Sequence, residues 1–279
     1  MQSEYPIHLL CATLDVSASG YHAWTQRPPS QREQANAALL PLITEAYQES
    51  RQTYGSPRIT HWLRTHGQPC SRARVAKLMR QAGVNRRPRR RFHPMSLTDS
   101  DHALPVAPNR LWQQAQPIRP NAVWVADITY VETGEGFLYV AGILDRCSRR
   151  CIGWAMGDTL HTTLPLAALD MALTQRRPTG GLLHHSDQGV QYASRNYRQR
   201  LAQAGAVPSM SRRGNCYDNA AMESFWSSLK RELIYRRKFA TRSEARAAIF
   251  EWIEVFYNRT RLHSALGYKS PVDFENQIN

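Results

Sequence analysis

Three acidic residues occupy positions where a side chain that serves only solubility would be unusual. Asp127 lies in the apolar run WVADITYV, Asp187 follows LLHHS, and Glu223 lies in the helical pattern AAMESFWSSL. A lone acid is usually a surface charge or a cap, but burying an unpartnered carboxylate is costly. Carboxylates that converge from separate elements bind Mg²⁺ or Mn²⁺, and two such ions can drive phosphoryl transfer. The three acids are therefore our candidate catalytic residues and metal ligands.

The helical pattern around Glu223 predicts where this side chain points. At 100° per residue, one narrow apolar stripe is formed by Met222, Phe225, Trp226, Leu229 and Leu233. Glu223 projects from the flank of this stripe, about 60° from Trp226. Lys230 returns to within roughly 20° of the direction of Glu223. We expect Glu223 to be neither a core residue nor freely solvated.

The elements that must position these acids are predicted by hydrophobic patterning. The runs VWVADITYVET, FLYVAGILD and CIGWAM favour three antiparallel strands. A helix over 164–174, a strand at LLHHSD, a helix over 195–203 and a strand at VPSMS then lead to the helix of Glu223. This order predicts an α/β domain with a mixed five-stranded sheet. Asp187 then falls at a strand end, where ligand crevices form in such sheets.

The first half of the chain is predicted to be helical. Two short helices around a turn are expected within 1–27, and a long amphipathic helix over 33–54. A helix over 58–66 is followed by one that begins after Ser71 and stops at Gly83. The last two form a helix-turn-helix, whose second helix carries basic residues on its outer faces. Those candidate DNA contacts are Arg72, Arg74 and Lys77.

The alternative is that this basic helix is a solvated face of a three-helix bundle. The neighbouring run RRPRRRF favours DNA, because it is too rich in charge to pack and suits phosphates or a minor groove. Its candidate DNA contacts are Arg86, Arg87, Arg89, Arg90 and Arg91. Arg212 and Arg213, in the loop before the Glu223 helix, are further candidates for phosphate contact.

Charge and composition agree with a nucleic-acid partner. The formal net charge is +14 and the pI is about 10.0. Residues 1–120 hold 16 Lys and Arg against 7 Asp and Glu, whereas residues 121–279 hold 20 against 15. No apolar stretch approaches a membrane span and no signal peptide is evident, so a cytosolic protein is expected. Five scattered cysteines suggest neither a disulfide framework nor a zinc site.

Changes in hydrophobic pattern and composition along the chain predict five segments. A short helical segment over 1–27 precedes a helix-turn-helix domain with a basic tail over 33–92. A linker rich in proline and polar residues covers 93–119, and the catalytic core covers 120–235. A helical extension of the core follows over 236–279.

The segments WVADITYV, HSDQGVQY and YDNAAMESFWSSLK resemble the catalytic motifs of retroviral-integrase-like cores. Fifty-nine residues separate the two aspartates, and 35 separate Asp187 from Glu223, which resembles the D, D, 35, E set. With the closing YNRTRLHSALGYKSPVDF, nearly the whole chain resembles the OrfB product of bacterial insertion sequences that make their transposase from two overlapping frames.

That resemblance implies an RNase-H-like core in which Asp127, Asp187 and Glu223 bind two Mg²⁺ or Mn²⁺ ions. It implies that Lys230 contacts DNA near the cleaved end. The expected function is a DNA transposase that binds element ends, cleaves a 3′ end and transfers it. Expected partners are double-stranded DNA, further copies of the chain on DNA, and an upstream-frame OrfA product as partner or fusion. A cytoplasmic, nucleoid-associated bacterial location follows.

Two other functions stay open from the residues alone. An RNase-H-like nuclease would share the metal site without needing the helix-turn-helix or the arginine run. A DNA-binding regulator would need those two features but not the three acids. Three polar residues near the site are given structural roles: His184 as a satisfied strand residue, Asp145 as a turn or ion-pair residue, and Asn219, with Asp218, as a helix N-cap.

Overall fold

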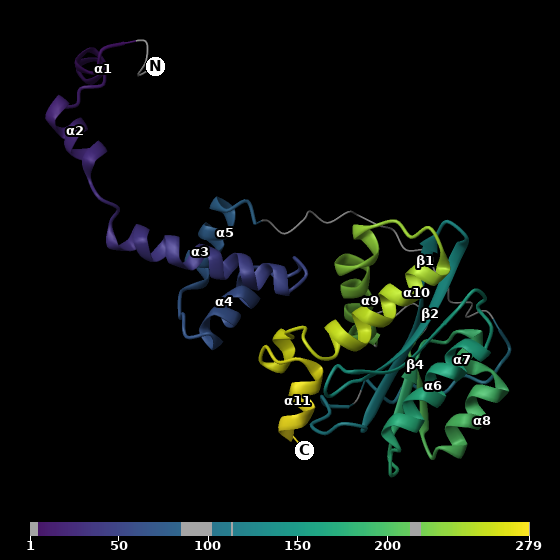
Figure 1. Ribbon diagram of the computed structural model, residues 1–279. Coiled ribbons are helices and arrows are strands. Elements are labelled where there is room, and N and C mark those ends of the chain that lie inside the picture. Colours follow the sequence, from purple (N-terminus) through teal and green to yellow (C-terminus); the bar gives the residue numbers. More distant parts are fainter. Residues whose placement is uncertain (1–4, 85–101, 113, 213–218, 279) are drawn as a thin grey trace. The chain divides into compact units, whose positions relative to one another are not determined.

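The chain folds into two compact units, Met1–Arg86 and Arg87–Asn279, each described here by itself (Figure 1). The computed structural model describes residues 5–84, 102–112, 114–212 and 219–278. Within these ranges no helix has the length and apolar character needed to cross a membrane.

The N-terminal unit is helical throughout its described part. Its helices are α1 (Ile7–Thr13), α2 (Ala18–Gln26), α3 (Gln31–Glu49), α4 (Ser56–Thr65) and α5 (Arg72–Gln81). The last three pack on one another through side chains that are fully shielded from solvent. These are Ile43, Ile59, Leu63 and Val75. The expected pairs of short helices at both places are therefore confirmed.

Local capping explains where these helices begin and end. Ser30 and Glu33 form a reciprocal capping box at the start of α3. The Ser71 hydroxyl accepts the backbone N–H of Arg74 at the start of α5, as its sequence position predicts. The predicted continuation of α3 to residue 54 is wrong, because Arg51 and Gln52 adopt left-handed φ values of 56° and 59°. Such values cannot continue a right-handed helix.

The second unit is built on a mixed sheet, as predicted. Its strands are β1 (Val123–Thr133), β2 (Gly136–Asp145), β3 (Cys151–Gly157), β4 (Leu183–Ser186) and β5 (Val207–Met210). Their order in the sheet is β3-β2-β1-β4-β5. The first three strands are antiparallel, whereas β4 pairs in parallel with both β1 and β5. β1 is therefore central, with β2 along one edge and β4 along part of the other.

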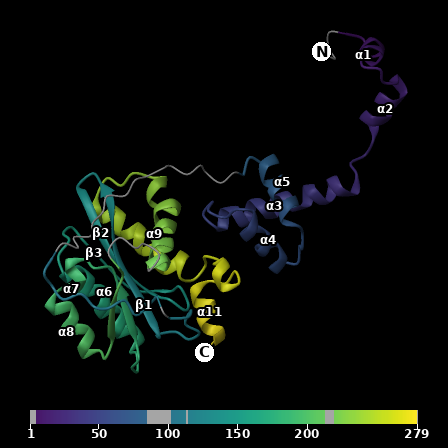
Figure 2. The same ribbon diagram turned by 180° about the vertical axis from the view of Figure 1, so that it is seen from behind.

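Helices cover both faces of this sheet (Figures 1 and 2). One face carries α6 (Thr163–Arg176), α7 (Val190–Ala193) and α8 (Arg195–Gln203), and the other carries α9 (Ala220–Glu232) and α10 (Arg242–Glu251). Successive side chains of a strand point to opposite faces. Trp124 and Ala126 of β1 belong to the core beneath α6, so Asp127 points toward the layer of α9.

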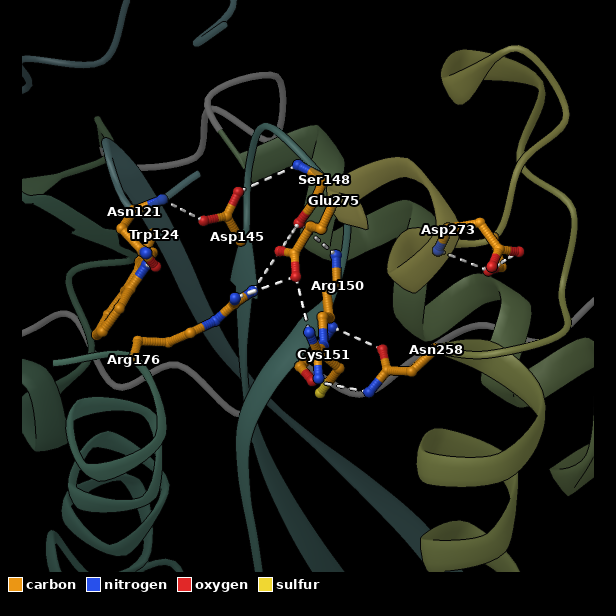
Figure 3. A network of polar contacts seen from close by, with 11 residues as sticks. Asn121, Trp124, Asp145, Ser148, Arg150, Cys151, Arg176, Asn258, Asp273 and Glu275 are labelled. Atoms are coloured by element: carbon orange, nitrogen blue, oxygen red, sulfur yellow. Dashed lines mark hydrogen bonds and ion pairs between the residues drawn. The ribbon is translucent and has the colours of Figure 1, made fainter. Parts of the chain in front are cut away.

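The chain after α10 folds back onto this unit. A π-helical turn, η3 (Trp252–Tyr257), and a 3₁₀ turn, η4 (Ser264–Leu266), lead to α11 (Pro271–Ile278). Glu275 of α11 is 2% exposed and forms ion pairs with Arg150 and Arg176 (Figure 3). It also accepts a hydrogen bond from the Ser148 hydroxyl at 2.7 Å. This network fixes α11 to the turn between β2 and β3 and to the end of α6.

Asp145 belongs to the same turn and has the structural role predicted for it. Its carboxylate accepts the backbone N–H groups of Asn121, Cys147 and Ser148 at 2.6–3.1 Å. The side chain is fully buried at the end of β2. Asp145 therefore organises the β2–β3 turn and holds the start of β1 beside it.

We predict that Glu275→Gln lowers the unfolding free energy of this unit by about 3 kcal/mol, since two arginines lose their buried partner. Burial raises the pKa of Glu275, but hydrogen bonds from Arg176, Ser148 and Arg150 outweigh it and lower the pKa overall. A lowered folded-state pKa gives stability that is present above the unfolded value, about 4.3, and lost as pH falls through the folded pKa. Urea unfolding at several pH values should show the deficit of the variant constant from pH 6 to 8 and shrinking below pH 4. A deficit that grows on acidification would contradict this role.

Candidate metal-binding active site

Asp127 lies at the point where β1 loses its parallel neighbour. The pairing of β1 with β4 runs only from Val123 to Val125, whereas pairing with β2 continues to Thr133. The carboxylate of Asp127 is half-buried and accepts two hydrogen bonds. Oδ1 accepts the backbone N–H of Ile128 at 2.8 Å, and Oδ2 accepts Nε1–H of Trp226 at 3.1 Å. These two hydrogen bonds fix the orientation of the Asp127 carboxylate.

Asp187 follows the last residue of β4 and is brought to Asp127 by the strand register. Val125 of β1 pairs with His185 of β4, so the residues two positions further along lie at the same end of the sheet. Oδ1 of Asp187 accepts the backbone N–H of Gly189 at 2.9 Å. A Cβ at position 189 would lie 3.0 Å from that same oxygen, so glycine suits this tight turn.

Glu223 lies in the first turn of α9, with its side chain exposed. The predicted apolar stripe of this helix is confirmed for Met222, Phe225, Trp226 and Leu229, all buried. The fifth predicted stripe residue, Leu233, is half-buried and occupies the C-cap position, just after the last residue of the helix. Burial still raises the pKa of Glu223, so its surroundings are less polar than bulk water.

The negative charges of Asp187 and Glu223 act on the carboxylate of Asp127. Burial, and then the negative charge of Asp187, raise the pKa of Asp127 to about 8, with a smaller contribution from Glu223. The hydrogen bonds from Ile128 and Trp226 oppose this rise but do not cancel it. Carboxylates repel in this way only when they lie close together. A divalent cation between them would offset the repulsion.

The donor chemistry of this site fits Mg²⁺ or Mn²⁺ rather than zinc or copper. Asp127, Asp187 and Glu223 offer only carboxylate oxygens, which hard cations prefer. In the described part of the chain, no three His, Cys, Asp or Glu side chains already stand close enough together to hold one ion. The two aspartates are fixed by the sheet, whereas Glu223 projects from a helix. Completion of a three-carboxylate site therefore depends on the side chain of Glu223.

Lys230 lies two turns along α9 from Glu223 and remains beside the acids. Its Nζ lies 5.2 Å from the centroid of the Tyr130 ring, on β1. Burial lowers the pKa of Lys230, and the nearby carboxylate of Asp127 acts in the opposite direction. The side chain is half-buried, so its charge is held near the carboxylates by the fold.

Trp226 orients a candidate catalytic residue, whereas the sequence pattern assigned it only to packing. A buried tryptophan needs a partner for its indole N–H, and here that partner is Asp127. The residue opposite Asp127 on β2 is Gly142. A Cβ at position 142 would lie 2.9 Å from Cη2 and 3.0 Å from Cζ2 of Trp226. The missing side chain of Gly142 thus makes room for the indole that orients Asp127.

Asn219 has a different role from the predicted one. It occupies the N-cap position of α9, but its side chain makes no capping hydrogen bond. Instead, Nδ2 donates to the backbone carbonyl of Ala126 at 3.2 Å. This carbonyl is the first on β1 beyond the pairing with β4, so it would otherwise lack a strand partner. Asn219 therefore ties the start of α9 to the strand of Asp127.

The remaining predicted residues lie outside this group of carboxylates. His184 is buried, and its Nε2 shares a hydrogen bond with the Tyr197 hydroxyl at 3.1 Å, which confirms it as a satisfied strand residue. In the N-terminal unit Arg72 and Lys77 are exposed on α5, while Nε of Arg74 donates to Asn36 of α3 at 2.8 Å. Arg212 lies with its guanidinium 6.0 Å from the Trp112 ring centroid. Outside the described residues lie Arg86, Arg87, Arg89, Arg90, Arg91, Arg213 and Asp218.

We predict that Gly142→Ala disturbs the site through Trp226. The added methyl should displace the indole, weaken its bond to Asp127 and lower the unfolding free energy by about 1–3 kcal/mol. Trp226→Phe removes the two ring atoms in close contact, so Gly142→Ala should cost much less in that background. Urea unfolding of both single variants and the double variant measures this coupling. Strictly additive losses would show that the two side chains do not compete for this space.

Comparison with known families identifies the class of protein. The family described as "Integrase core domain" matches residues 117–216, and a second family of the same description matches residues 204–271. An "HTH-like domain" matches residues 33–92. Together with the strand order, these matches confirm the expected RNase-H-like α/β core preceded by a helix-turn-helix region.

Relatives that span nearly the whole chain identify the family more closely. Transposase InsF for insertion sequence IS3A of Escherichia coli (strain K12) is 40% identical over 278 residues, covering 99% of this chain and 96% of the relative. The IS600 insertion element protein of 31 kDa from Shigella sonnei is 46% identical over 270 residues, covering 97% and 98%. The chain belongs to the IS3-type family of insertion-sequence transposases, as its motifs predicted.

Solved structures similar in fold are distant in sequence. A chain in a simian T-cell lymphotropic virus intasome, solved in complex with PP2A regulatory subunit B56 gamma, has a TM-score of 0.47 and 14% identity, covering 77% of this chain and 70% of its own. The catalytic core domain of HTLV-2 integrase, solved with magnesium, has a TM-score of 0.42 and 12% identity, covering 57% and 98%.

Proposed function

We propose that this transposase binds the ends of its insertion sequence, cleaves a DNA 3′ end and transfers it to target DNA. The observation that carries the proposal is the strand register that places Asp127 and Asp187 at the same end of the β1–β4 pairing, within an integrase core, with Glu223 on the helix that covers this strand. Carboxylates held where they repel lower stability, so their presence in a folded core indicates a functional site. The polynucleotidyl transferase reaction of this class needs such a site.

In this proposal Asp127, Asp187 and Glu223 hold two Mg²⁺ or Mn²⁺ ions. Bound there, the ions would supply Lewis-acid activation of the attacking oxygen and charge stabilisation of the leaving oxygen. Trp226 and the backbone of Ile128 keep the Asp127 oxygens directed toward the site. Water and a DNA 3′ hydroxyl are equivalent nucleophiles in this chemistry, so one site serves both cleavage and transfer. No protein nucleophile is required.

Lys230 is proposed to bind a DNA phosphate beside the reacting end. The residue is half-buried, its Nζ lies 5.2 Å from the centroid of the Tyr130 ring, and the charge of Asp127 acts on it. A cation held at this place can accompany a phosphate into an acidic site that would otherwise repel it. Arg212, exposed beside Trp112, and Arg213, which follows it in the sequence, are proposed to contact the strand further out.

The N-terminal unit is proposed to hold double-stranded DNA of the element end. α4 and α5 form the helix-turn-helix, and Arg72 and Lys77 are exposed on α5. Arg74 shares its guanidinium with Asn36, so it is also a packing residue. The arginines Arg86, Arg87, Arg89, Arg90 and Arg91 are proposed to add phosphate contacts. Further copies of the chain on DNA, and an OrfA product as partner or fusion, complete the proposed assembly, at the bacterial nucleoid.

The five segment boundaries predicted from the sequence remain part of this proposal. Two alternative functions are tested beside it: a nuclease without strand transfer and a DNA-binding regulator without catalysis. The nuclease would cleave without joining, and the regulator would bind DNA with all three acids replaced by amides and show no reaction with any metal.

We predict that Asp127→Asn, Asp187→Asn and Glu223→Gln each reduce strand transfer at least 1,000-fold, because each removes an anionic ligand. Purified protein, labelled element-end DNA and Mg²⁺ or Mn²⁺, with products separated on a denaturing gel, measure this. Binding in a gel shift should survive in all three variants. Strand transfer retained by any single variant, or product formed without divalent metal, would contradict the site assignment.

We also predict that Arg72→Ala with Lys77→Ala weakens element-end binding and lowers the slope of log affinity against log salt by about 2, one for each lost phosphate contact. The matched control is Arg195→Ala, because Arg195 is exposed on α8, on the face of the sheet opposite to α9. A fluorescence-anisotropy titration at four salt concentrations gives both slopes. An unchanged slope in the α5 variant would move the DNA site away from this helix.

A further inference from the structure

The catalytic helix is held by a C-terminal segment that begins 25 residues after its last residue. Arg261 lies in the stretch YNRTRLHSALGY and is 4% exposed. Its Nε and Nη2 donate to the two carboxylate oxygens of Glu232 at 2.8 and 2.7 Å. Nη2 also donates to the Ser228 hydroxyl at 3.1 Å. One buried guanidinium thus binds α9 at two positions, Ser228 and Glu232, which lie one turn apart.

Aromatic contacts extend this grip toward the start of the helix. The Tyr257 ring lies 4.7 Å from Phe225 of α9, edge to face, and 4.9 Å from His263. The Arg261 guanidinium lies 5.8 Å from the centroid of the same Tyr257 ring. Phe225, Ser228 and Glu232 are spaced by three and four residues, so they form one stripe along α9.

A second stripe of α9 faces the sheet. Met222 and Trp226 contact the position of Gly142 on β2, and Leu229 is fully buried. Glu232 is nine residues from Glu223, which places them about 180° apart around the helix axis and about 13 Å apart along it. The helix is therefore held on two faces, and Glu223 and Lys230 occupy a third.

We propose that Arg261 is a positioning residue that fixes the rotation of α9 and so directs Glu223 toward Asp127 and Asp187. The inference rests on the proposed metal site, since it explains how the exposed third carboxylate is aimed. Apolar side chains on the sheet stripe allow a helix to roll by small angles, because dispersion contacts have little directionality. A bidentate pair between a planar guanidinium and a carboxylate is directional and resists such rolling.

Lysine cannot replace arginine in this role. Its ammonium is a point charge on a flexible stem and cannot bond both Glu232 oxygens and Ser228 in one fixed plane. Arg261→Lys therefore keeps the charge but loses the geometry. The matched control is Glu275→Gln, which breaks the other buried ion network of this unit, between α11 and the β2–β3 turn, without touching α9.

The experiment measures Mn²⁺ affinity by isothermal titration, with the full chain, at a temperature where every variant is folded. We expect Arg261→Lys to weaken Mn²⁺ binding about 10-fold, the lower end of what loss of a group that orients a metal ligand directly costs, because Arg261 acts on Glu223 only through the helix. Glu275→Gln should lower the melting temperature and leave Mn²⁺ affinity within about twofold of wild type. The double variant Arg261→Glu with Glu232→Arg should bind Mn²⁺ more tightly than the single variant Arg261→Glu, because the exchange restores an ion pair between the two positions. Wild-type affinity in a folded Arg261→Lys variant would overturn the proposal.

A second readout does not depend on metal. Hydrogen exchange of the backbone amides of α9 should be faster in Arg261→Lys than in wild type, and unchanged in Glu275→Gln. If Arg261→Lys fails to fold, Ser228→Ala removes a single contact of the same guanidinium and should give a smaller change of the same sign in both readouts. If wild type binds no Mn²⁺, the metal site fails, and faster exchange in α9 still reports the grip of Arg261. Unchanged exchange in α9 would refute it.

Discussion

The carboxylate of Asp127, held half-buried where β1 parts from β4, is the constraint on which the core depends. An acid at this point is destabilising by itself, because burial and Asp187 both favour its neutral form. The surrounding residues nevertheless fix the Asp127 side chain in one orientation. Trp226 donates to one oxygen, Ile128 to the other, and Asn219 covers the carbonyl left open beside it. These contacts position the charge without neutralising it, as a site that receives a cation requires.

The helix α9 joins this strand to the rest of the unit. Its start is tied to β1 by Asn219, its apolar stripe lies over Gly142, and its far side is held by Arg261. The C-terminal segment is therefore part of the scaffold of the candidate active site. α11 is anchored separately, through Glu275, to the turn that follows β2 (Figure 3). Two separate buried ion-pair networks thus attach the C-terminal segment to this unit, one at α9 and one at the β2–β3 turn.

Much of this arrangement could be predicted from local sequence. Alternating apolar residues gave the three antiparallel strands, and the spacing of Asp127, Asp187 and Glu223 indicated the chemistry. Ser71 and Gly83 marked the ends of the basic helix correctly. The signals for strands and helix ends act over a few residues, within one strand, one helix or one turn, whereas the three acids were singled out by the resemblance of their motifs and spacing to those of a known family. The end of α3 was missed because the left-handed conformations of Arg51 and Gln52 leave no glycine or proline as a sign.

The contacts that position the acids could not be predicted in this way. The hydrogen bond from Trp226 to Asp127 depends on Gly142, which faces Asp127 only through the register of β1 and β2. Arg261 meets Glu232 across 29 residues of sequence. Such pairings follow from tertiary packing, and a single sequence carries no periodic signal for them. The buried tryptophan, which needs an N–H acceptor, was the one available indication.

The most direct test of a cation site at Asp127 and Asp187 is thermal unfolding of the purified protein against Mn²⁺ concentration. A cation bound by the folded state alone adds about 2.7 kcal/mol of stability at 100 times its dissociation constant. We expect the melting temperature of wild type to rise with Mn²⁺, and that of Asp187→Asn to remain constant. The metal-free variant should also melt higher than metal-free wild type, because Asp127 loses its repelling neighbour. An equal rise with Mn²⁺ in both proteins, or none in wild type, would contradict the account.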